Sequence, residues 1–252
     1  MLLRLPGVED LYVVEGTPVL YHARSGSILL ADLHLGYEQA MAELGVFLPR
    51  VQLRKALSAL EKALDSAKPK RVVIVGDVKH VFDRLLRQEA IEVSRLVGWL
   101  REKGVAEVMV VRGNHDNYIQ GVVTKSSGEF VEDYVDLGGG VAATHGHKRV
   151  GLDAEVLVIG HEHPALQVSV GGSRIKYPAF LLVPRREGGL IVVLPATGVY
   201  QTGNPVSLVG DAYLSPYVRE EGVVEDAIPV ISDESVGALV LPPLRESKAA
   251  LG

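Results

Sequence analysis

The side chains best suited to chemistry are gathered in five short segments of this chain. They contain seven of the eight histidines, together with aspartates, an asparagine and a glutamate. In chain order the segments are Ala31-Asp32-Leu33-His34-Leu35-Gly36, Val75-Gly76-Asp77-Val78-Lys79-His80, Arg112-Gly113-Asn114-His115-Asp116, Thr144-His145-Gly146-His147 and Gly160-His161-Glu162-His163-Pro164. Each follows a run of apolar, mostly β-branched residues, so each is expected at the end of a buried strand. Such residues at strand ends are typical ligands of a hydrolytic metal centre.

The composition limits which metals and partners fit. The chain has no cysteine, which excludes disulfides, thiolate metal sites and thiol catalysis. Nitrogen and oxygen ligands favour Mn, Fe, Zn or Mg. The net charge of −5 argues against broad, non-specific binding of duplex DNA, although a local basic patch is compatible with it. A low content of Asn and Gln, beside many Val, Arg and Glu residues, is typical of thermophile proteins.

The length and the apolar content bound the domain organisation. A chain of 252 residues that is 47% hydrophobic can form one large α/β domain or two small ones. No interdomain linker or repeat is evident, so we expect a single domain over residues 1–252, with a core at about 19–200 and a tail at about 201–252 that wraps it. The chain shows neither a signal-peptide pattern nor an apolar run of the roughly 20 residues that a membrane helix needs. We therefore expect a cytoplasmic protein.

The first half of the chain alternates strand and helix patterns. Strands are predicted at Ser27–Ala31, Arg71–Val75 and Glu107–Val111. Between them, apolar residues at helical spacing predict one helix from near Pro49 to before Pro69 and a second from Asp83, as its cap, to Gly104. This alternation predicts βαβ units and a largely parallel sheet.

The second half is expected to be mostly strands. The predicted strands are Val131–Leu137, Gly140–Thr144, Glu155–Ile159, Leu166–Val170, Arg174–Tyr177 and Leu190–Leu194, with a tight hairpin turn at Gly171-Gly172. From Thr202 onward Pro and Gly are frequent and the periodicity is poor. One domain with a two-part sheet system accounts for both halves.

Each short segment also has an ordinary structural explanation when it is taken alone. Asp32 and His34 fit a capped turn with a surface histidine, and Gly76-Asp77 fits a simple strand end. Paired histidines, as in His145-Gly146-His147 and His161-Glu162-His163, are harder to explain, because buried imidazoles need partners. All five segments in order, each after a strand, favour the metal centre.

The five segments in this order resemble the signature of the calcineurin-like metallophosphoesterases, which reads Asp-x-His, Gly-Asp, Gly-Asn-His-Asp/Glu, His and Gly-His-x-His. Within that superfamily the chain is most similar to archaeal SbcD-related and bacterial ligase-associated phosphoesterases. The similarity to this subgroup rests on Lys79-His80, His145-Gly146-His147, His163-Pro164 and Tyr213-Leu214-Ser215-Pro216. The resemblance implies a four-layer α/β/β/α sandwich of two mixed sheets flanked by helices.

The resemblance also implies roles for the site residues. Asp32, His34 and His163 would hold the first of two divalent metal ions, Asn114, His145 and His161 would hold the second, and Asp77 would bridge the two. His115 would bind no metal and would assist catalysis beside the scissile phosphate. Either His145 or His147 could be the ligand in the fourth segment, and we favour His145 because it directly follows a strand. The expected metal is Mn²⁺, with Fe, Zn and Ni as alternatives.

Five further residues are candidates for contacts with the substrate or for supporting the ligands. They are His80, Asp116, His147, Lys148 and Arg149. His80 stands where many members of the superfamily carry an acid, and the adjacent Lys148 and Arg149 could hold a phosphate oxygen. For His80 a bystander role, and for the basic pair a solvated surface role, remain alternatives.

The function expected from the resemblance is metal-dependent hydrolysis of phosphodiester bonds, in nucleic acid or nucleotides. DNA or RNA substrates, DNA-repair partner proteins and a homodimer are expectations from the family alone, and no membrane contact is expected. A non-catalytic metal-binding scaffold of the same fold is the alternative, but every ligand position is filled. A phosphomonoesterase or phosphoprotein phosphatase ranks lower, because Arg112 lacks the Asn-Arg-Gly-Asn-His-Glu context. The absence of a capping domain weakens the case for a processive exonuclease.

Overall fold

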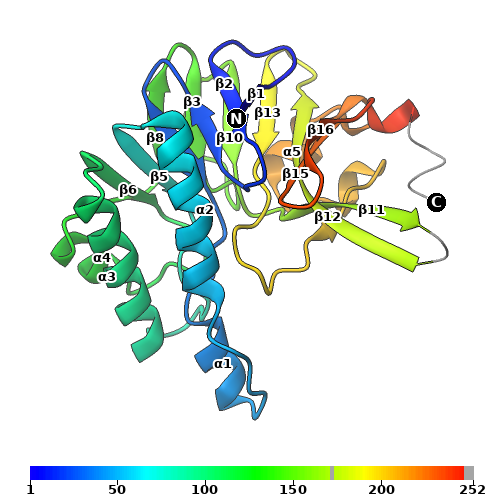
Figure 1. Ribbon diagram of the computed structural model, residues 1–252. Coiled ribbons are helices and arrows are strands. Elements are labelled where there is room, and N and C mark those ends of the chain that lie inside the picture. The colour runs from blue at the N-terminus through cyan, green and yellow to red at the C-terminus, as the bar shows by residue number, and fades with distance from the viewer. Residues whose placement is uncertain (171–172, 247–252) are drawn as a thin grey trace.

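Two β-sheets lie face to face in the computed structural model, which describes residues 1–170 and 173–246 (Figure 1). The first sheet holds β1 (Leu2–Arg4), β2 (Leu11–Val14), β3 (Leu20–His22), β4 (Ser27–Leu30), β5 (Arg71–Val75), β6 (Glu107–Val111) and β7 (Glu129–Val131), in that order. Strands β1 to β4 are antiparallel, and β4 to β7 are parallel. The predicted parallel βαβ region is thus preceded by an antiparallel meander.

The second sheet is also mixed. Its strands are β8 (Tyr134–Gly138), β9 (Val141–Thr144), β10 (Val156–Ile159), β11 (Pro164–Val170), β12 (Ser173–Pro184), β13 (Leu190–Val193), β14 (Asn204–Pro205), β15 (Ile228–Asp233) and β16 (Gly237–Val240). Their order is β14-β11-β12-β13-β10-β9-β8, and β15 adds to β12 and carries β16. Strand β10 runs parallel to both β9 and β13, whereas the other pairs in the centre are antiparallel.

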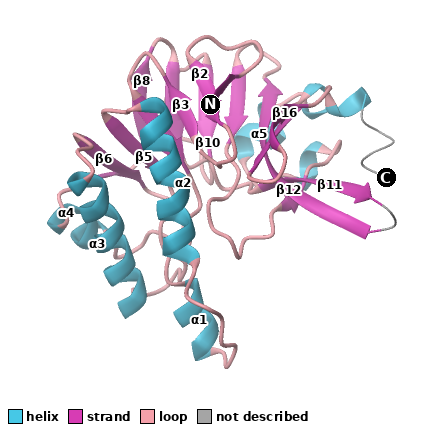
Figure 2. Cartoon of the chain, in the orientation of Figure 1, coloured by secondary structure: helices cyan, strands magenta, loops and turns pink. Residues whose placement is uncertain are grey.

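Helices cover the outer faces of the two sheets (Figure 2). They are α1 (Tyr37–Glu43), α2 (Gln52–Ala67), α3 (Arg87–Glu102), α4 (Gln120–Lys125) and α5 (Pro216–Glu221), with the 3₁₀ turns η1 (Gly210–Ala212), η2 (Val224–Asp226) and η3 (Leu244–Glu246). Helices α2, α3 and α4 pack on the first sheet, while α5 and η2 cover the second. This is the expected four-layer α/β/β/α arrangement. None of the helices in the described ranges is both long enough and apolar enough to cross a bilayer.

The alternation of side chains along each strand explains the layers. In β5, Val72 and Ile74 point to the helices, whereas Val73 and Val75 point into the core between the sheets. In β13, Val192 points into the same core, while its neighbours face α5 and the 3₁₀ turns. Because both faces of these strands are buried, their sequences are nearly continuous apolar runs.

The run predicted as one strand, Val131–Leu137, is two strands in different sheets. Strand β7 ends at Val131 in the first sheet, and β8 begins at Tyr134 in the second. The exposed Glu132 and Asp133 separate them and mark the crossing between sheets. The sequence pattern cannot distinguish one interrupted strand from two, because both flanks pack against the core between the sheets.

The C-terminal tail is more regular than its composition indicates. Strand β15 pairs with β12 along Ala179–Leu182, so part of the tail extends the second sheet. The predicted strand Arg174–Tyr177 is the beginning of the longer β12. The hairpin turn predicted at Gly171-Gly172 lies outside the described residues.

The cap predicted for the long helix is wrong. Helix α3 begins at Arg87, and its first turn is held by Glu89, not Asp83. One Glu89 carboxylate oxygen accepts hydrogen bonds from the backbone N–H groups of His80 (3.0 Å) and Val81 (2.6 Å), and the other accepts one from Leu86 (2.7 Å). Glu89 is fully buried, so its side chain fixes the whole loop between β5 and α3.

Replacement of Glu89 by alanine should therefore destabilise the protein strongly. Three backbone donors would lose their acceptor, and we expect the free energy of unfolding to fall by about 2–5 kcal/mol. Asp83→Ala is the matched control, because that side chain is 71% exposed, and it should change stability by less than about 0.5 kcal/mol. Urea denaturation followed by circular dichroism measures both, and equal losses would contradict the assignment of Glu89.

Candidate metal centre

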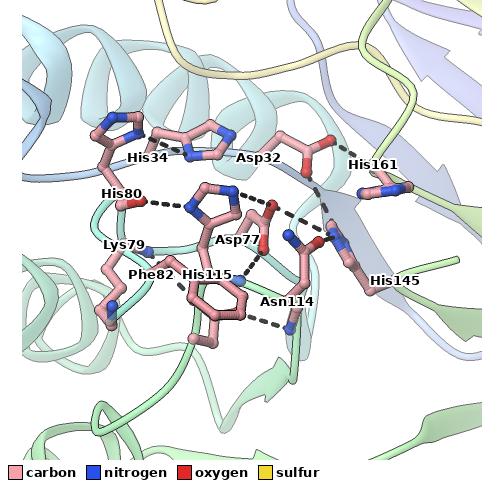
Figure 3. A network of polar contacts seen from close by, with 12 residues as sticks. Asp32, His34, Asp77, Lys79, His80, Phe82, Asn114, His115, His145 and His161 are labelled. Carbon is pink, nitrogen blue, oxygen red and sulfur yellow. Dashed lines mark hydrogen bonds and ion pairs between the residues drawn. The ribbon is translucent and has the colours of Figure 1, made fainter. Parts of the chain in front are cut away.

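The five polar segments converge at one end of the two facing sheets. They follow β4, β5 and β6 in the first sheet and β9 and β10 in the second. Within each sheet these strands are parallel and in register, with Leu30 opposite Ile74 and Thr144 opposite Ile159. Their carboxyl ends are therefore level, and the side chains that follow them meet, as Figure 3 shows.

One cluster of possible ligands contains Asp32, His34 and His163, whose ligand atoms all lie within 4.8 Å of one another. The Nε2 atoms of His34 and His163 are 3.4 Å apart, and His163 Nε2 lies 3.4 Å from Asp32 Oδ1. Asp32 Oδ1 is buried and has no hydrogen-bond partner in the described part of the chain. A buried carboxylate oxygen without a donor is costly, so a cation at this position fits the donor set.

A second cluster contains Asp77, His145 and His161. His145 Nδ1 donates to the carbonyl of Val75 (3.0 Å), which turns Nε2 toward Asp77 Oδ2 (3.4 Å) and Asn114 Oδ1 (3.2 Å). Because Nδ1 is used by the backbone, Nε2 is the ring nitrogen available to a metal. His145 Nε2, Asp77 Oδ2 and Asn114 Oδ1 thus lie close together, and such a set of one nitrogen and two oxygens is suited to binding a divalent cation.

Asp77 connects the second cluster to His115. Asp77 Oδ2 lies 3.4 Å from His145 and 3.9 Å from His115 Nε2, while Oδ1 accepts the His115 backbone N–H at 2.9 Å. Figure 3 shows the Asp77 carboxylate between the His115 and His145 rings, with His34 and Asp32 above it in this view. This central place is compatible with the bridging role expected for Asp77.

Burial sets the protonation of the ring nitrogens. It lowers the pKa of His34 to about 3 and that of His161 to about 4, which keeps both rings neutral. Burial also acts to lower the pKa of His145, but Asp77 and Asp32 outweigh it and raise that pKa to about 9. The charge of His145 and its hydrogen bond to Asp77 in turn outweigh burial and hold the pKa of Asp77 well below its usual range. A cation bound here would displace the proton of His145.

Unusual backbone conformations accompany the ligands. Nine of the described residues other than glycine have a positive φ angle, and they include five of the expected ligands. These five are Asp32 (φ 55°), His34 (46°), Asp77 (47°), His161 (69°) and His163 (47°). A left-handed residue other than glycine costs roughly 1 kcal/mol or more. The fold maintains this strain where the side chains must turn inward.

Glycines in the segments make room for the convergence. A Cβ on Gly76 would lie 2.2 Å from His145 Nδ1, and one on Gly113 would lie 2.1 Å from Asp77 Oδ1. Both distances are far shorter than real contacts. These glycines are therefore required by the neighbouring ligands rather than by the turns alone.

Asp116 supports the backbone of two segments. Its Oδ1 accepts the N–H groups of Val78 (2.9 Å) and Lys79 (3.3 Å), and its Oδ2 accepts that of Gly113 (2.8 Å). Burial, followed by the charge of Asp77, raises the pKa of Asp116 to about 6. Asp116 thus ties the loop after β5 to the loop after β6, and substrate contact by this residue stays a prediction.

His80 and His147 lie beside the two clusters. His80 Nδ1 is 3.4 Å from His34 Nδ1, and these residues form a third group of possible ligands with His115. The His147 ring lies 5.2 Å from that of His145, and its Nδ1 is buried without a partner among the described residues. His145, which is fully buried, is the member of the second cluster, so the geometry favours our choice of His145 over His147 as ligand.

The two basic residues after the fourth segment face carboxylates. Lys148 Nζ lies 2.9 Å from Asp133, while Arg149 pairs with Glu220 (3.0 Å) and Glu221 (2.7 Å). Both side chains are about half exposed. These pairs fit the solvated alternative, and phosphate binding by Lys148 or Arg149 stays a prediction.

Glu162 is a site residue that sequence reasoning missed. Its carboxylate accepts the backbone N–H groups of Leu214 (3.1 Å) and Ser215. The Ser215 hydroxyl in turn donates to the carbonyl of Gly146 at 2.7 Å. The tail is thereby bonded to the loops that carry His145 and His161. The position of Glu162 between two histidines was the available signal, but the sequence does not identify its partner.

A family model identifies the family of this chain, and a solved structure shares its fold. A family model described as calcineurin-like phosphoesterase matches residues 28–156, from β4 into β10. A solved structure of the Pseudomonas putida nuclease MPE is 18% identical, covers 95% of this chain and 99% of its own, and superposes with a TM-score of 0.65. The phosphoesterase Yfce from E. coli is 20% identical over 71% of this chain and 84% of its own, with a TM-score of 0.43. No curated protein sequence matches the chain. The family match, which includes the first four of the five segments, shows that this chain belongs to the calcineurin-like phosphoesterases, which are metal-dependent.

Proposed function

We propose that this protein is a two-metal phosphodiesterase that hydrolyses phosphodiester bonds in nucleic acid or nucleotides. The observation that carries the proposal is the pair of ligand clusters, Asp32-His34-His163 and Asp77-His145-His161, at the same end of the two sheets. Both consist of nitrogen and oxygen donors from buried or half-buried side chains. The strained conformations of these donors support metal binding, and the non-catalytic metal-binding scaffold is separated from the enzyme by the activity measurement below.

We assign the residues to the two metals as the family resemblance implies. Asp32, His34 and His163 would hold the first, Asn114, His145 and His161 the second, and Asp77 would contribute to both. We propose Mn²⁺ as the metal, since mixed imidazole and carboxylate donors suit it. When bound, two such cations supply Lewis acidity that activates water and offsets charge on a phosphate.

The catalytic role that we propose for His115 rests on the contacts of its ring. Its Nδ1–H donates to the carbonyl of His80, which fixes the ring and leaves Nε2 free on the side of Asp77. The side chain is 28% exposed, so that nitrogen can reach a bound phosphate. We propose that His115, when protonated, donates a proton from Nε2 to the leaving oxygen.

The choice of nucleic acid or nucleotides follows from the subgroup resemblance. The Lys79-His80 pair and the Tyr213-Leu214-Ser215-Pro216 segment carry it. The structural neighbour from Pseudomonas putida is called a nuclease, and we take the same class of substrate for this chain as part of the proposal. Because the net charge is −5, binding must depend on local contacts at the centre rather than on general attraction to phosphates.

Asp77→Asn tests the central ligand. The amide keeps the size of the side chain but removes the negative charge shared by the metals, so Mn²⁺-dependent hydrolysis of bis-p-nitrophenyl phosphate should fall at least about 100-fold. Calorimetric titration with Mn²⁺ should show weaker binding in the same variant. Full activity in Asp77→Asn would exclude the bridging role, and a wild type inactive with Mn²⁺, Ni²⁺ and Zn²⁺ would favour the scaffold.

His115→Ala should separate catalysis from metal binding. Loss of the proton donor is expected to lower the turnover number about 10²- to 10⁴-fold. The Mn²⁺ content measured by atomic absorption should stay at the wild-type level, because His115 is not among the assigned ligands. Loss of the metal together with activity would instead make His115 a ligand.

A further inference from the structure

An exposed phenylalanine lies directly beside His115. Phe82 is 56% exposed, and the centroid of its ring lies 6.0 Å from the centroid of the His115 ring. The two rings are perpendicular, with an interplanar angle of 88° (Figure 3). In such a perpendicular pair the two rings do not stack, and the 56% exposure of Phe82 leaves part of this residue accessible beside His115.

The backbone around Phe82 is held by hydrogen bonds from the side chains of Lys79 and Asn117. Lys79, which is fully buried, donates from Nζ to the carbonyls of Val81 and Arg84 (3.1 Å), on either side of Phe82. The carbonyl of Phe82 itself accepts a hydrogen bond from Asn117 Nδ2 at 3.0 Å. The fold therefore presents an apolar ring to solvent on a fixed backbone.

This rigidity distinguishes Phe82 from an incidental surface residue. The ordering of its backbone is already provided by Lys79 and Asn117, so a ligand that covers the ring does not have to order the loop. Asn117 is in turn fixed by Arg112, whose guanidinium donates to Asn117 Oδ1 at 2.8 Å. The same loops thus position both the ligands and the phenyl ring.

Another aromatic ring near the centre is less accessible. Tyr37 contacts the His80 ring at 4.6 Å, but one of its faces is stacked on Tyr200, with centroids 5.3 Å apart and planes at 18°. Tyr37 is half-buried, whereas Phe82 is exposed. Phe82 is therefore the better stacking surface of the two.

We propose that Phe82 is a binding platform for an unpaired nucleobase next to the scissile phosphate. The inference rests on the proposed function, because it needs the phosphate to lie at His115. A nucleotide carries its base one sugar away from its phosphate, which brings the base within reach of the adjacent phenyl ring. Base–aromatic stacking is strong and tolerates any base, and it requires a base face that is not already stacked in a duplex.

Stacking on Phe82 would supply affinity for nucleic acid that the net charge of the protein does not provide. General attraction to a polyanion is weak for a chain with a net charge of −5. Stacking depends little on charge, so Phe82 provides affinity and orientation at the reacting diester itself. The inference assigns the substrate class as nucleic acid with single-stranded character at the cleavage point.

The experiment uses a fluorescently labelled, single-stranded thymidine decamer in which one central residue lacks its base. With Mn²⁺, the wild type should cut one of the two diesters that flank this residue about 5- to 150-fold more slowly than the other diesters of the strand. This factor corresponds to the loss of one base–aromatic stacking interaction. A denaturing gel resolves every product, so the unmodified positions are internal controls. Phe82→Ala should cut all positions at a similar, lower rate, and Phe82→Trp should restore the wild-type pattern.

Phe47→Ala is the matched control, because Phe47 is another exposed phenylalanine (85%) and lies in the loop between α1 and α2, outside the five polar segments. It should cut as the wild type does. A wild type without slow cleavage beside the base-free residue, or a Phe82→Ala variant that retains it, would overturn the proposal. Hydrolysis of bis-p-nitrophenyl phosphate without cleavage of the decamer would also overturn it while the phosphodiesterase stands. Hydrolysis of neither substrate would instead reject the proposed function.

Discussion

The rest of the structure depends on the unfavourable burial of two carboxylates, Asp32 and Asp77, which lie close together among histidines. Each is removed from water, and their negative charges repel each other. Asp32 and Asp77 are almost inaccessible to solvent, and Asp32 Oδ1 has no donor in the described part of the chain. An arrangement of this kind is unfavourable for the protein alone. It becomes favourable when positive charge occupies the space between the donors. The strained residues, the motif glycines and the backbone support from Asp116 all serve to maintain it.

Much of this centre could be predicted from the sequence, because its determinants are local. A strand with two buried faces appears in the sequence as an apolar run, and the expected ligands stand in the turn that follows it. Strands β4, β5 and β10 and the polar residues after them can therefore be predicted together. The family resemblance then distinguishes ligands from ordinary turn residues. The resemblance also implies the division of the histidines into two groups, and the facing sheets give its physical basis, since His34 and His163 come from opposite sides of the core.

The features that could not be predicted depend on contacts that form only in the folded chain. Glu132 and Asp133 look like an irregularity within one strand until β7 and β8 are seen to pair in different sheets. Asp83 is a plausible cap by composition, but only the folded loop brings the Glu89 carboxylate to the backbone of His80 and Val81. The tail strand β15 has no strong pattern of its own and forms because β12 offers it an edge. In each case tertiary contacts override local preference.

The hydrogen bonds from Ser215 and Glu162 have a consequence for the order of events during synthesis. A ribosome delivers the chain from its N-terminus, so β4, β5, β6, β9 and β10 are available long before residue 215 emerges. Until then Glu162 lacks its backbone donors and the carbonyl of Gly146 lacks the Ser215 hydroxyl, so the loops bearing His145 and His161 lack these hydrogen bonds. Completion of the centre is thereby coupled to synthesis of the segment that holds Leu214 and Ser215, so the loops of the second cluster gain these hydrogen bonds only after all five polar segments have been made.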